Sequence, residues 1–185
     1  MSEQTQPFPF GASLEKAHLS KIEQSPEVMQ KLAYWMKKEG DLFFFCGNVG
    51  TGKSYFASAF YNHLKDTNRD VRAITEHKLF SLLRVAINNE WDASAELERI
   101  CDIDFFILDD MGSSTMTDWQ KNILFEFVNM RTESGLPTLI TSNLSRKEIK
   151  ENFHERFESR IYAAKNTIIE LNGEDRRQWK EKDGQ

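Results

Sequence analysis

A chain of 185 residues has the length of one globular domain, and its 39% of hydrophobic residues is enough for a core. The formal net charge of −5 argues against a strongly basic nucleic-acid-binding protein, although a local basic patch is compatible with it. We expect no membrane span, because no apolar run reaches about 18 residues, and no secretory signal at the amino terminus.

The first part of the chain is predicted to carry little regular structure. Prolines and a glycine precede Ser13, which can cap a short helix. A longer helix is predicted for residues 26–38, where apolar residues recur at helical spacing, and Gly40 ends it. We therefore divide the chain into an N-terminal extension at 1–25, which is disordered or binds a partner, and one domain at 26–180.

From residue 42 onward, predicted strands and helices alternate. The strands are expected at 42–46, 71–75, 104–110, 138–143 and 167–171. Helices are expected at 53–65, 76–89, 93–101 and 117–134, and one or two more at 145–161. Thr117 is the expected N-cap of the helix at 117–134. In the second of these, the predicted buried side consists of Leu79, Leu82, Leu83, Ala86 and Ile87. Several strands are apolar throughout, which is typical of a parallel sheet covered on both faces.

The most informative motif, GNVGTGKS, follows the first predicted strand and opens a helix. It fits the phosphate-binding P-loop, in which glycines let the backbone N–H groups turn toward a triphosphate. Lys53 would reach the β- and γ-phosphates, and the Ser54 hydroxyl would coordinate Mg²⁺. The predicted nucleotide-binding residues are Gly47, Asn48, Val49, Gly50, Thr51, Gly52, Lys53, Ser54 and Tyr55.

Two further groups of polar residues follow predicted strands. Asp109 and Asp110 end an apolar strand, where Asp109 would support Mg²⁺ and Asp110 would orient or deprotonate the attacking water. Solvated acids at a strand end are the alternative. Ser142 and Asn143 end the next strand and could hold that water or touch the γ-phosphate; a helix N-cap region is the alternative, since Ser145 follows.

Two arginines in the segment ERFESRI, Arg156 and Arg160, stand four positions apart and share a helix face. An arginine supplied by a neighbouring subunit can neutralise charge in the transition state of phosphoryl transfer. Judged on spacing alone, a solvated helix with ion pairs to its own glutamates is the stronger reading. Cys46 and Cys101 lie far apart in sequence, which predicts reduced thiols and a cytoplasmic protein.

The order P-loop, ILDD, TSN and ERFESRI resembles the AAA+ ATPases, and the stretch around ILDDMGSS resembles their DnaC/IstB group of helicase loaders and transposition helpers. The resemblance covers residues 26–179. It implies a three-layer α/β P-loop fold with a parallel five-stranded sheet of order 5-1-4-3-2, a minimal or absent C-terminal lid, and ATP and Mg²⁺ as ligands. Because only about 40 residues precede the P-loop, we expect the N-terminal domain usual in such loaders to be missing.

The same resemblance implies roles for individual residues. Asn143 would be sensor 1, and Arg160 the arginine finger acting in trans, with Arg156 as the second choice. Arg177 would contact the γ-phosphate as sensor 2, with Arg176 as the alternative. Helix 76–89 would touch single-stranded DNA through Lys78 and Arg84, although ordinary core packing explains that helix equally well. No role is assigned to Arg131.

Three functions remain open on this reading. The leading one is a helicase loader that assembles head to tail and binds a DnaB-type replicative helicase, with a short helicase-binding element around Phe8 and Phe10 or elsewhere. The second is an IstB-like transposition helper on double-stranded DNA. The third is a DNA-binding adaptor that uses ATP only as a switch. A phage or mobile-element origin suits the compact size.

Overall fold

The computed structural model describes residues 8–22, 26–37, 42–89, 92–153 and 155–171. Residues 176 and 177, which carry the predicted sensor 2 arginines, lie outside the described residues, as does the predicted helix end at residue 40. None of the described helices is long and apolar enough to cross a membrane.

A parallel five-stranded sheet forms the centre of the molecule. Its strands are β1 (Leu42–Gly47), β2 (Val71–Thr75), β3 (Phe105–Met111), β4 (Thr138–Ser142) and β5 (Thr167–Leu171). They lie in the order β2-β3-β4-β1-β5, which is the predicted order 5-1-4-3-2 counted from the other edge. All four neighbouring pairs are parallel, so the sequence-based prediction of the sheet is confirmed.

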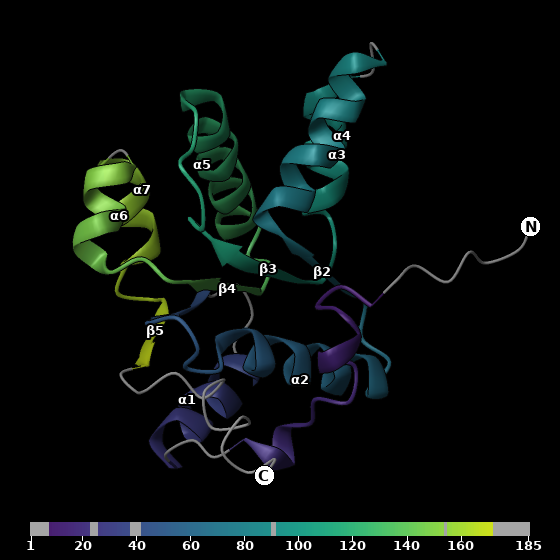
Figure 1. Cartoon of the computed structure of the whole chain (residues 1–185), viewed down its shortest axis with the longest axis vertical. Helices are drawn as coiled ribbons and strands as arrows, with labels where there is room; N and C mark the ends of the chain where they lie inside the picture. The colour runs from purple at the N-terminus through teal and green to yellow at the C-terminus, as the bar shows by residue number, and fades with distance from the viewer. Residues whose placement is uncertain (1–7, 23–25, 38–41, 90–91, 154, 172–185) are drawn as a thin grey trace, which may run out of the picture.

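Helices cover both faces of the sheet, which explains why strands such as β1 are apolar along nearly their whole length. One face carries α3 (Glu76–Asn88), α4 (Ala93–Cys101), α5 (Asp118–Glu133), α6 (Arg146–Asn152) and α7 (Glu155–Ile161), and the other carries α1 (Pro26–Lys37) and α2 (Lys53–Asp66) (Figure 1). Side chains of β1 alternate between the two cores: Phe44 packs in the first, and Phe43 and Phe45 pack in the second.

Local sequence sets several helix starts. The Thr117 hydroxyl accepts from the amide of Gln120, whose side chain accepts from the Thr117 amide, and this capping box starts α5 as predicted. Ser145 and Glu148 make the same arrangement at α6. These caps hold the helices that follow β3 and β4, so they also fix the loops at the carboxyl ends of those strands.

The predicted buried side of α3 needs one correction. Ile87 is 48% exposed, whereas Phe80, which was not assigned to that side, is buried. Phe80 and Ile87 are seven positions apart and therefore share a helix face, but Ile87 lies in the last turn of α3, one residue before its end at Asn88. On the opposite side of the helix, Val85 is 50% exposed, so the outer side of α3 presents an apolar residue as well as charged ones.

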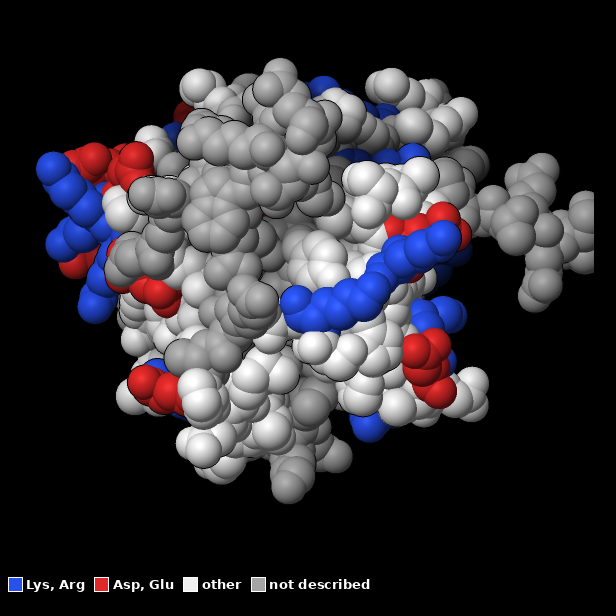
Figure 2. Space-filling model, turned by 60° about the horizontal axis from the view of Figure 1, so that its bottom comes forward, with Lys and Arg blue, Asp and Glu red and all other residues white. Residues whose placement is uncertain are grey.

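The described part of the N-terminal extension packs along α2. The Ser58 hydroxyl donates to the Leu14 carbonyl at 2.8 Å, and the Asn62 amide donates to the Ala17 carbonyl at 2.8 Å. The rings of Phe8 and Phe10 contact Tyr61, with centroids 5.8 and 6.0 Å away. On the molecular face turned forward in Figure 2, basic and acidic side chains are interspersed among uncharged ones.

Candidate functional site

The loop between β1 and α2 has the geometry that the P-loop motif predicts. Gly50 and Gly52 have φ values of +79° and +96°, which residues other than glycine rarely adopt. Gly47 is required for a different reason: a Cβ there would lie 2.1 Å from the Leu171 carbonyl oxygen. The glycines let the loop turn tightly beside β5 and bring the amino terminus of α2 to the same point, where backbone N–H groups attract anions.

Lys53, the first residue of α2, is buried and reaches back over the loop. Its Nζ donates to the carbonyls of Gly47 at 2.8 Å and Asn48 at 2.7 Å. Thr51 also donates from its hydroxyl to the Asn48 carbonyl, at 2.8 Å. These bonds hold the ammonium group at the mouth of the loop, where it can meet the phosphates of a nucleotide.

A β-bulge in β3 turns the side chains of Asp109 and Asp110 in different directions. Leu108 pairs with Ile140 and Met111 pairs with Ser142, so two residues of β3 face the single residue Thr141 of β4. Asp109 continues the strand and is 5% exposed. Asp110 has a φ of +61°, in the left-handed region, which directs it away from the strand. The bulge thus separates an inner carboxylate from an outer one.

The inner carboxylate of Asp109 contacts two hydroxyls. Thr141 donates to Asp109 Oδ1 at 2.6 Å, and the Ser54 side chain also hydrogen-bonds to this carboxyl. Burial raises the pKa of Asp109, and the two hydroxyl bonds oppose that rise. Mg²⁺ prefers such hard oxygen ligands. Ser54 and Asp109, the two predicted Mg²⁺ residues, are adjacent and fit the ion.

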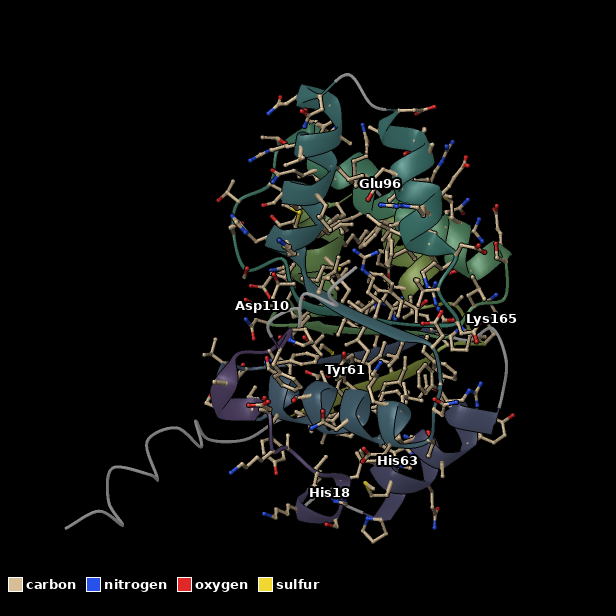
Figure 3. All side chains as sticks on the ribbon, turned by 90° about the vertical axis from the view of Figure 1, so that its right-hand side faces the viewer. His18, Tyr61, His63, Glu96, Asp110 and Lys165 are labelled. Atoms are coloured by element: carbon tan, nitrogen blue, oxygen red, sulfur yellow. The ribbon has the colours of Figure 1, made fainter. Side chains whose placement is uncertain are left out.

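The outer carboxylate of Asp110 lies at the carboxyl edge of the sheet, opposite Lys165 in Figure 3. Asn143 Nδ2 donates to Asp110 Oδ1 at 3.2 Å, and the Asp110 amide donates to the Thr141 hydroxyl at 2.9 Å. The predicted general base and the predicted sensor 1 residue are therefore in direct contact. This pair lies at the end of the strand that carries Asp109, so the polar residues at the ends of β3 and β4 meet beside Ser54.

Sequence reasoning missed two residues of this site. Thr141 contacts both aspartates, and Glu76, at the start of α3, accepts from the Gly112 amide just past the bulge. The available sign for Thr141 was its place beside Ser142 and Asn143 at the carboxyl end of β4. Glu76 offered none, because a glutamate in the first turn of a helix is ordinary.

The two candidate arginine fingers, Arg156 and Arg160, are not part of this cluster. Arg160, on α7, makes an ion pair with Glu133 of α5, with Nη2 and Oε1 3.2 Å apart. Arg156 is exposed on the same helix. An arginine in this place would have to act on the nucleotide of another subunit, as the trans role requires. On α3, Lys78 and Arg84 are both exposed.

Arg131, to which no role was assigned, is fully buried at the edge of the sheet where β3 and β4 begin, opposite the P-loop. Its guanidinium donates to four backbone carbonyls and to the Thr138 hydroxyl, at distances from 2.6 to 3.3 Å. Burial lowers its pKa to about 10. It ties the turn before β3 and the turn before β4 to α5, so its role is structural.

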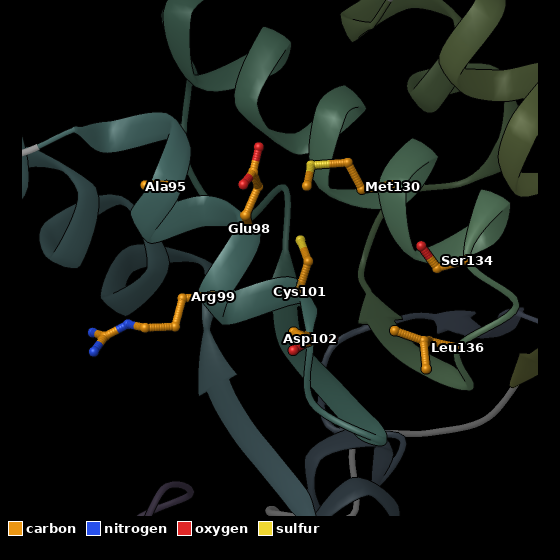
Figure 4. Close-up of a pocket in the computed structure, with 8 residues that line it drawn as sticks. All are labelled: Ala95, Glu98, Arg99, Cys101, Asp102, Met130, Ser134 and Leu136. Atoms are coloured by element: carbon orange, nitrogen blue, oxygen red, sulfur yellow. The ribbon is translucent and has the colours of Figure 1, made fainter.

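A hollow of about 420 Å³ lies near Arg131, between the carboxyl ends of α4 and α5. Cys101, Met130 and Leu136 are among its lining residues, whereas the Arg99 side chain extends away from them (Figure 4). It lies where β3 and β4 begin, at the other edge of the sheet from Asp110. It is therefore separate from the P-loop cluster.

The fold and the cluster of Lys53, Ser54, Asp109, Asp110 and Asn143 define a P-loop protein of the AAA+ class. A family model described as IstB-like ATP binding protein matches residues 8–170. The chain belongs to this family, within the DnaC/IstB type of AAA+ ATPases.

Individual relatives agree with this assignment. The replicative helicase loader DnaC of Escherichia coli (strain K12) is 28% identical over 120 residues, which are 64% of this chain and 49% of that protein. The chain thus spans about half the length of such curated relatives.

Two solved structures share the fold. The crystal structure of the DnaC helicase loader superposes with a TM-score of 0.73 at 20% identity, over 88% of this chain and 100% of that one. A replication initiator DnaA bound to AMPPCP and single-stranded DNA gives a TM-score of 0.73 at 18% identity, over 90% of this chain and 55% of that one.

Proposed function

We propose that this chain binds ATP with Mg²⁺, hydrolyses it slowly alone and faster with DNA or a partner, and acts in DNA replication as a helicase loader. The observation that carries the ATPase part is the contact between Asp110 and Asn143 beside the Ser54–Asp109 pair. The family and its DnaC relatives support the loader part. With this function, the proposed location is the cytoplasm of a bacterial or phage-infected host cell.

Each residue of the cluster has a task in hydrolysis. Lys53 and the loop amides bind the β- and γ-phosphates. Ser54 and Asp109 would hold Mg²⁺, which would supply positive charge to the phosphate oxygens. Asp110 orients the attacking water and accepts its proton, since its carboxylate lies at the open edge of the sheet. Asn143 holds Asp110 by its 3.2 Å hydrogen bond and senses the γ-phosphate.

Complete catalysis then requires a second copy of the chain. Arg160 is paired with Glu133 on its own chain and is absent from the P-loop cluster, so it would act on a neighbour's nucleotide. Such contacts are head to tail and build rings or open filaments. Arg177 would complete the site in cis, but it lies outside the described residues.

Mixing two inactive variants tests this arrangement. Arg160→Ala keeps an intact P-loop, and Lys53→Ala keeps its own arginine finger. We expect each to be inactive alone and their mixture to recover part of the parent turnover, because a Lys53→Ala subunit supplies Arg160 to its neighbour. Full turnover by Arg160→Ala in the assembled state would contradict the trans role.

The outer side of α3 is the proposed contact for single-stranded DNA. Lys78 and Arg84 are exposed there and can meet phosphates, and Val85, which is 50% exposed, offers an apolar contact to bases. A DnaA of the same fold has been solved with single-stranded DNA bound, which supports single-stranded DNA as the ligand. The helicase-binding element remains a proposal at Phe8 and Phe10, both of which are half-buried against Tyr61.

Affinity capture from host lysate tests the loader function. The tagged chain is incubated with and without a non-hydrolysable ATP analogue, with Lys53→Ala as the matched control, and captured proteins are identified by mass spectrometry. We expect the replicative helicase to be recovered with the analogue and lost with Lys53→Ala. Recovery of a transposase in its place would remove the loader proposal.

The second candidate is a transposition helper, which the match to the IstB-like family favours. It predicts ATP-dependent filaments on double-stranded DNA. Binding of the chain with an ATP analogue to single- and double-stranded oligonucleotides of equal length separates the two functions: the loader prefers the single strand, and the helper prefers the duplex.

A further inference from the structure

Glu76 is a buried carboxylate that the proposed reaction does not use. It is the first residue of α3, after the capping residue Thr75, and is 3% exposed. None of the ion pairs between described residues includes it. A buried carboxylate without a basic partner is costly, so its contacts should explain why it is there.

Its main contact is the turn that follows the β-bulge. The Gly112 amide donates to Glu76 Oε2 across 36 positions of the sequence. Gly112 has a φ of +78°, and a Cβ there would lie 2.3 Å from Leu144 Cδ1, so the turn is tightly confined on that side. Asp110, two residues earlier, is also in the left-handed region, with a φ of +61°.

The other side chains that hold the turn come from β4 or the residue after it. Thr141 accepts from the Asp110 amide, Ser142 donates to the Met111 carbonyl at 2.7 Å, and Asn143 donates to Asp110 Oδ1. Glu76 binds the turn from the α3 side. The turn that carries Asp110 is thus held between β4 and α3.

We propose that Glu76 is a positioning residue for ATP hydrolysis, which fixes the Gly112 backbone and thereby the direction of the Asp110 carboxylate. This inference rests on the proposed ATPase function. Glu76 acts through the turn and does not touch the nucleotide. Its loss would therefore reduce turnover without a matching loss of ATP binding, because the P-loop contacts of Lys53 and Ser54 remain.

Three variants separate this role from general destabilisation. Glu76→Ala removes the acceptor, Glu76→Gln keeps a carbonyl oxygen that can accept from the Gly112 amide, and His77→Ala changes the exposed neighbour in the same helical turn. We expect Glu76→Ala to lower kcat about 10-fold or more, because misplacement by about 1 Å costs up to ~100-fold, with the Kd for ATP within about 3-fold of the parent value. Glu76→Gln should restore most of kcat, and His77→Ala should leave it unchanged.

Amide hydrogen exchange gives a readout that does not depend on turnover. We expect the Gly112 amide to exchange faster in Glu76→Ala than in the parent or Glu76→Gln. An unchanged kcat in Glu76→Ala, or a parallel loss of kcat and ATP affinity, would overturn the positioning role. If the parent chain shows no ATPase activity, the proposed function fails, but hydrogen exchange still tests whether Glu76 fixes the Gly112 backbone. An unchanged exchange rate of the Gly112 amide in Glu76→Ala would show that it does not.

Discussion

Charged groups are buried at both edges of the sheet, the one where its strands begin and the one where they end, but the partners of these groups differ between the two. At the edge where strands begin, Arg131 donates to four carbonyls and a hydroxyl of its own chain. At the edge where strands end, Glu76 and Asp109 are buried carboxylates, and burial raises the pKa of both. The first edge is complete within one chain.

The second edge is arranged for ligands from outside the chain. Burial raises the pKa of Asp109, and the charge of the adjacent Asp110 adds to that rise. A bound cation would relieve this repulsion, and a nucleotide would occupy the P-loop opposite them. A buried charge alone therefore says little about function; what matters is whether the chain itself neutralises it.

The largest effect is expected from Asp110→Asn, which acts at the second edge. Asparagine keeps the size of the side chain but cannot accept the proton of water, so we expect kcat for ATP hydrolysis to fall by about 100-fold or more. The Kd for ATP should stay within about 3-fold, because the P-loop is untouched. Phosphate release and binding of a fluorescent ATP analogue measure the two quantities. The control is Asp118→Asn, since Asp118 is an exposed aspartate on α5. Turnover of Asp110→Asn near the parent value would exclude Asp110 as the base.

Arg131→Lys tests the first edge. A lysine has three donors on one atom and cannot span the five acceptors that the guanidinium fork reaches, so buried carbonyls lose their partners. We expect the free energy of unfolding to fall by about 2–4 kcal/mol in urea titrations, with kcat per folded molecule unchanged. The exposed Arg99→Lys is the matched control and should change stability by less than about 0.5 kcal/mol. A large loss of kcat in folded Arg131→Lys would mean that the two edges are coupled.

Glu76→Gln tests the second edge through the pH dependence of stability. Burial raises the pKa of Glu76 from 4.5 to about 7, and the charge of Asp110 adds to the rise, while the Gly112 amide opposes it. The folded chain thus binds this proton more tightly than the unfolded chain, so its contribution to stability is greatest below about pH 4.5 and is lost as the pH rises to about 7.

Glutamine has no proton to lose, so Glu76→Gln removes this dependence. We expect its free energy of unfolding, relative to the parent, to increase by up to about 3 kcal/mol between about pH 4 and about pH 8. Urea unfolding of both proteins across this range measures the difference. A constant difference would show that Glu76 titrates normally and that its burial costs nothing.

Sequence patterns predicted the parts of this molecule that short-range spacing determines. The P-loop glycines, the capping residue Thr117 and the sheet order all follow from motifs or from the family resemblance, and the structure confirms the geometry of the loop, the cap and the order. The meeting of Asp110 and Asn143 was foreseeable too, because parallel strands end at one edge.

Contacts that depend on tertiary packing were not predictable in this way. Glu76 and Gly112 are 36 positions apart, and no local pattern links them. The bulge in β3 is invisible in the residues FFILDD, which read as a regular strand, although it separates Asp109 from Asp110. The exposure of Ile87 shows the same limit: it shares a face of α3 with the buried Phe80, but it lies in the last turn, and the periodicity does not say how far along the helix the core extends.

The smallest effect is expected for Glu133→Gln, which frees Arg160 on its own chain. The pair is partly exposed, with side chains 39% and 61% accessible, so it contributes about 0.5 kcal/mol and stability should scarcely change. If Arg160 must leave Glu133 to reach a neighbour's nucleotide, the same energy opposes assembly. Glu133→Gln should then lower the protein concentration for half-maximal ATPase about 2-fold, whereas Glu126→Gln, an exposed glutamate on the same helix, should not. A higher concentration requirement in Glu133→Gln would instead mean that Glu133 holds Arg160 in its active orientation.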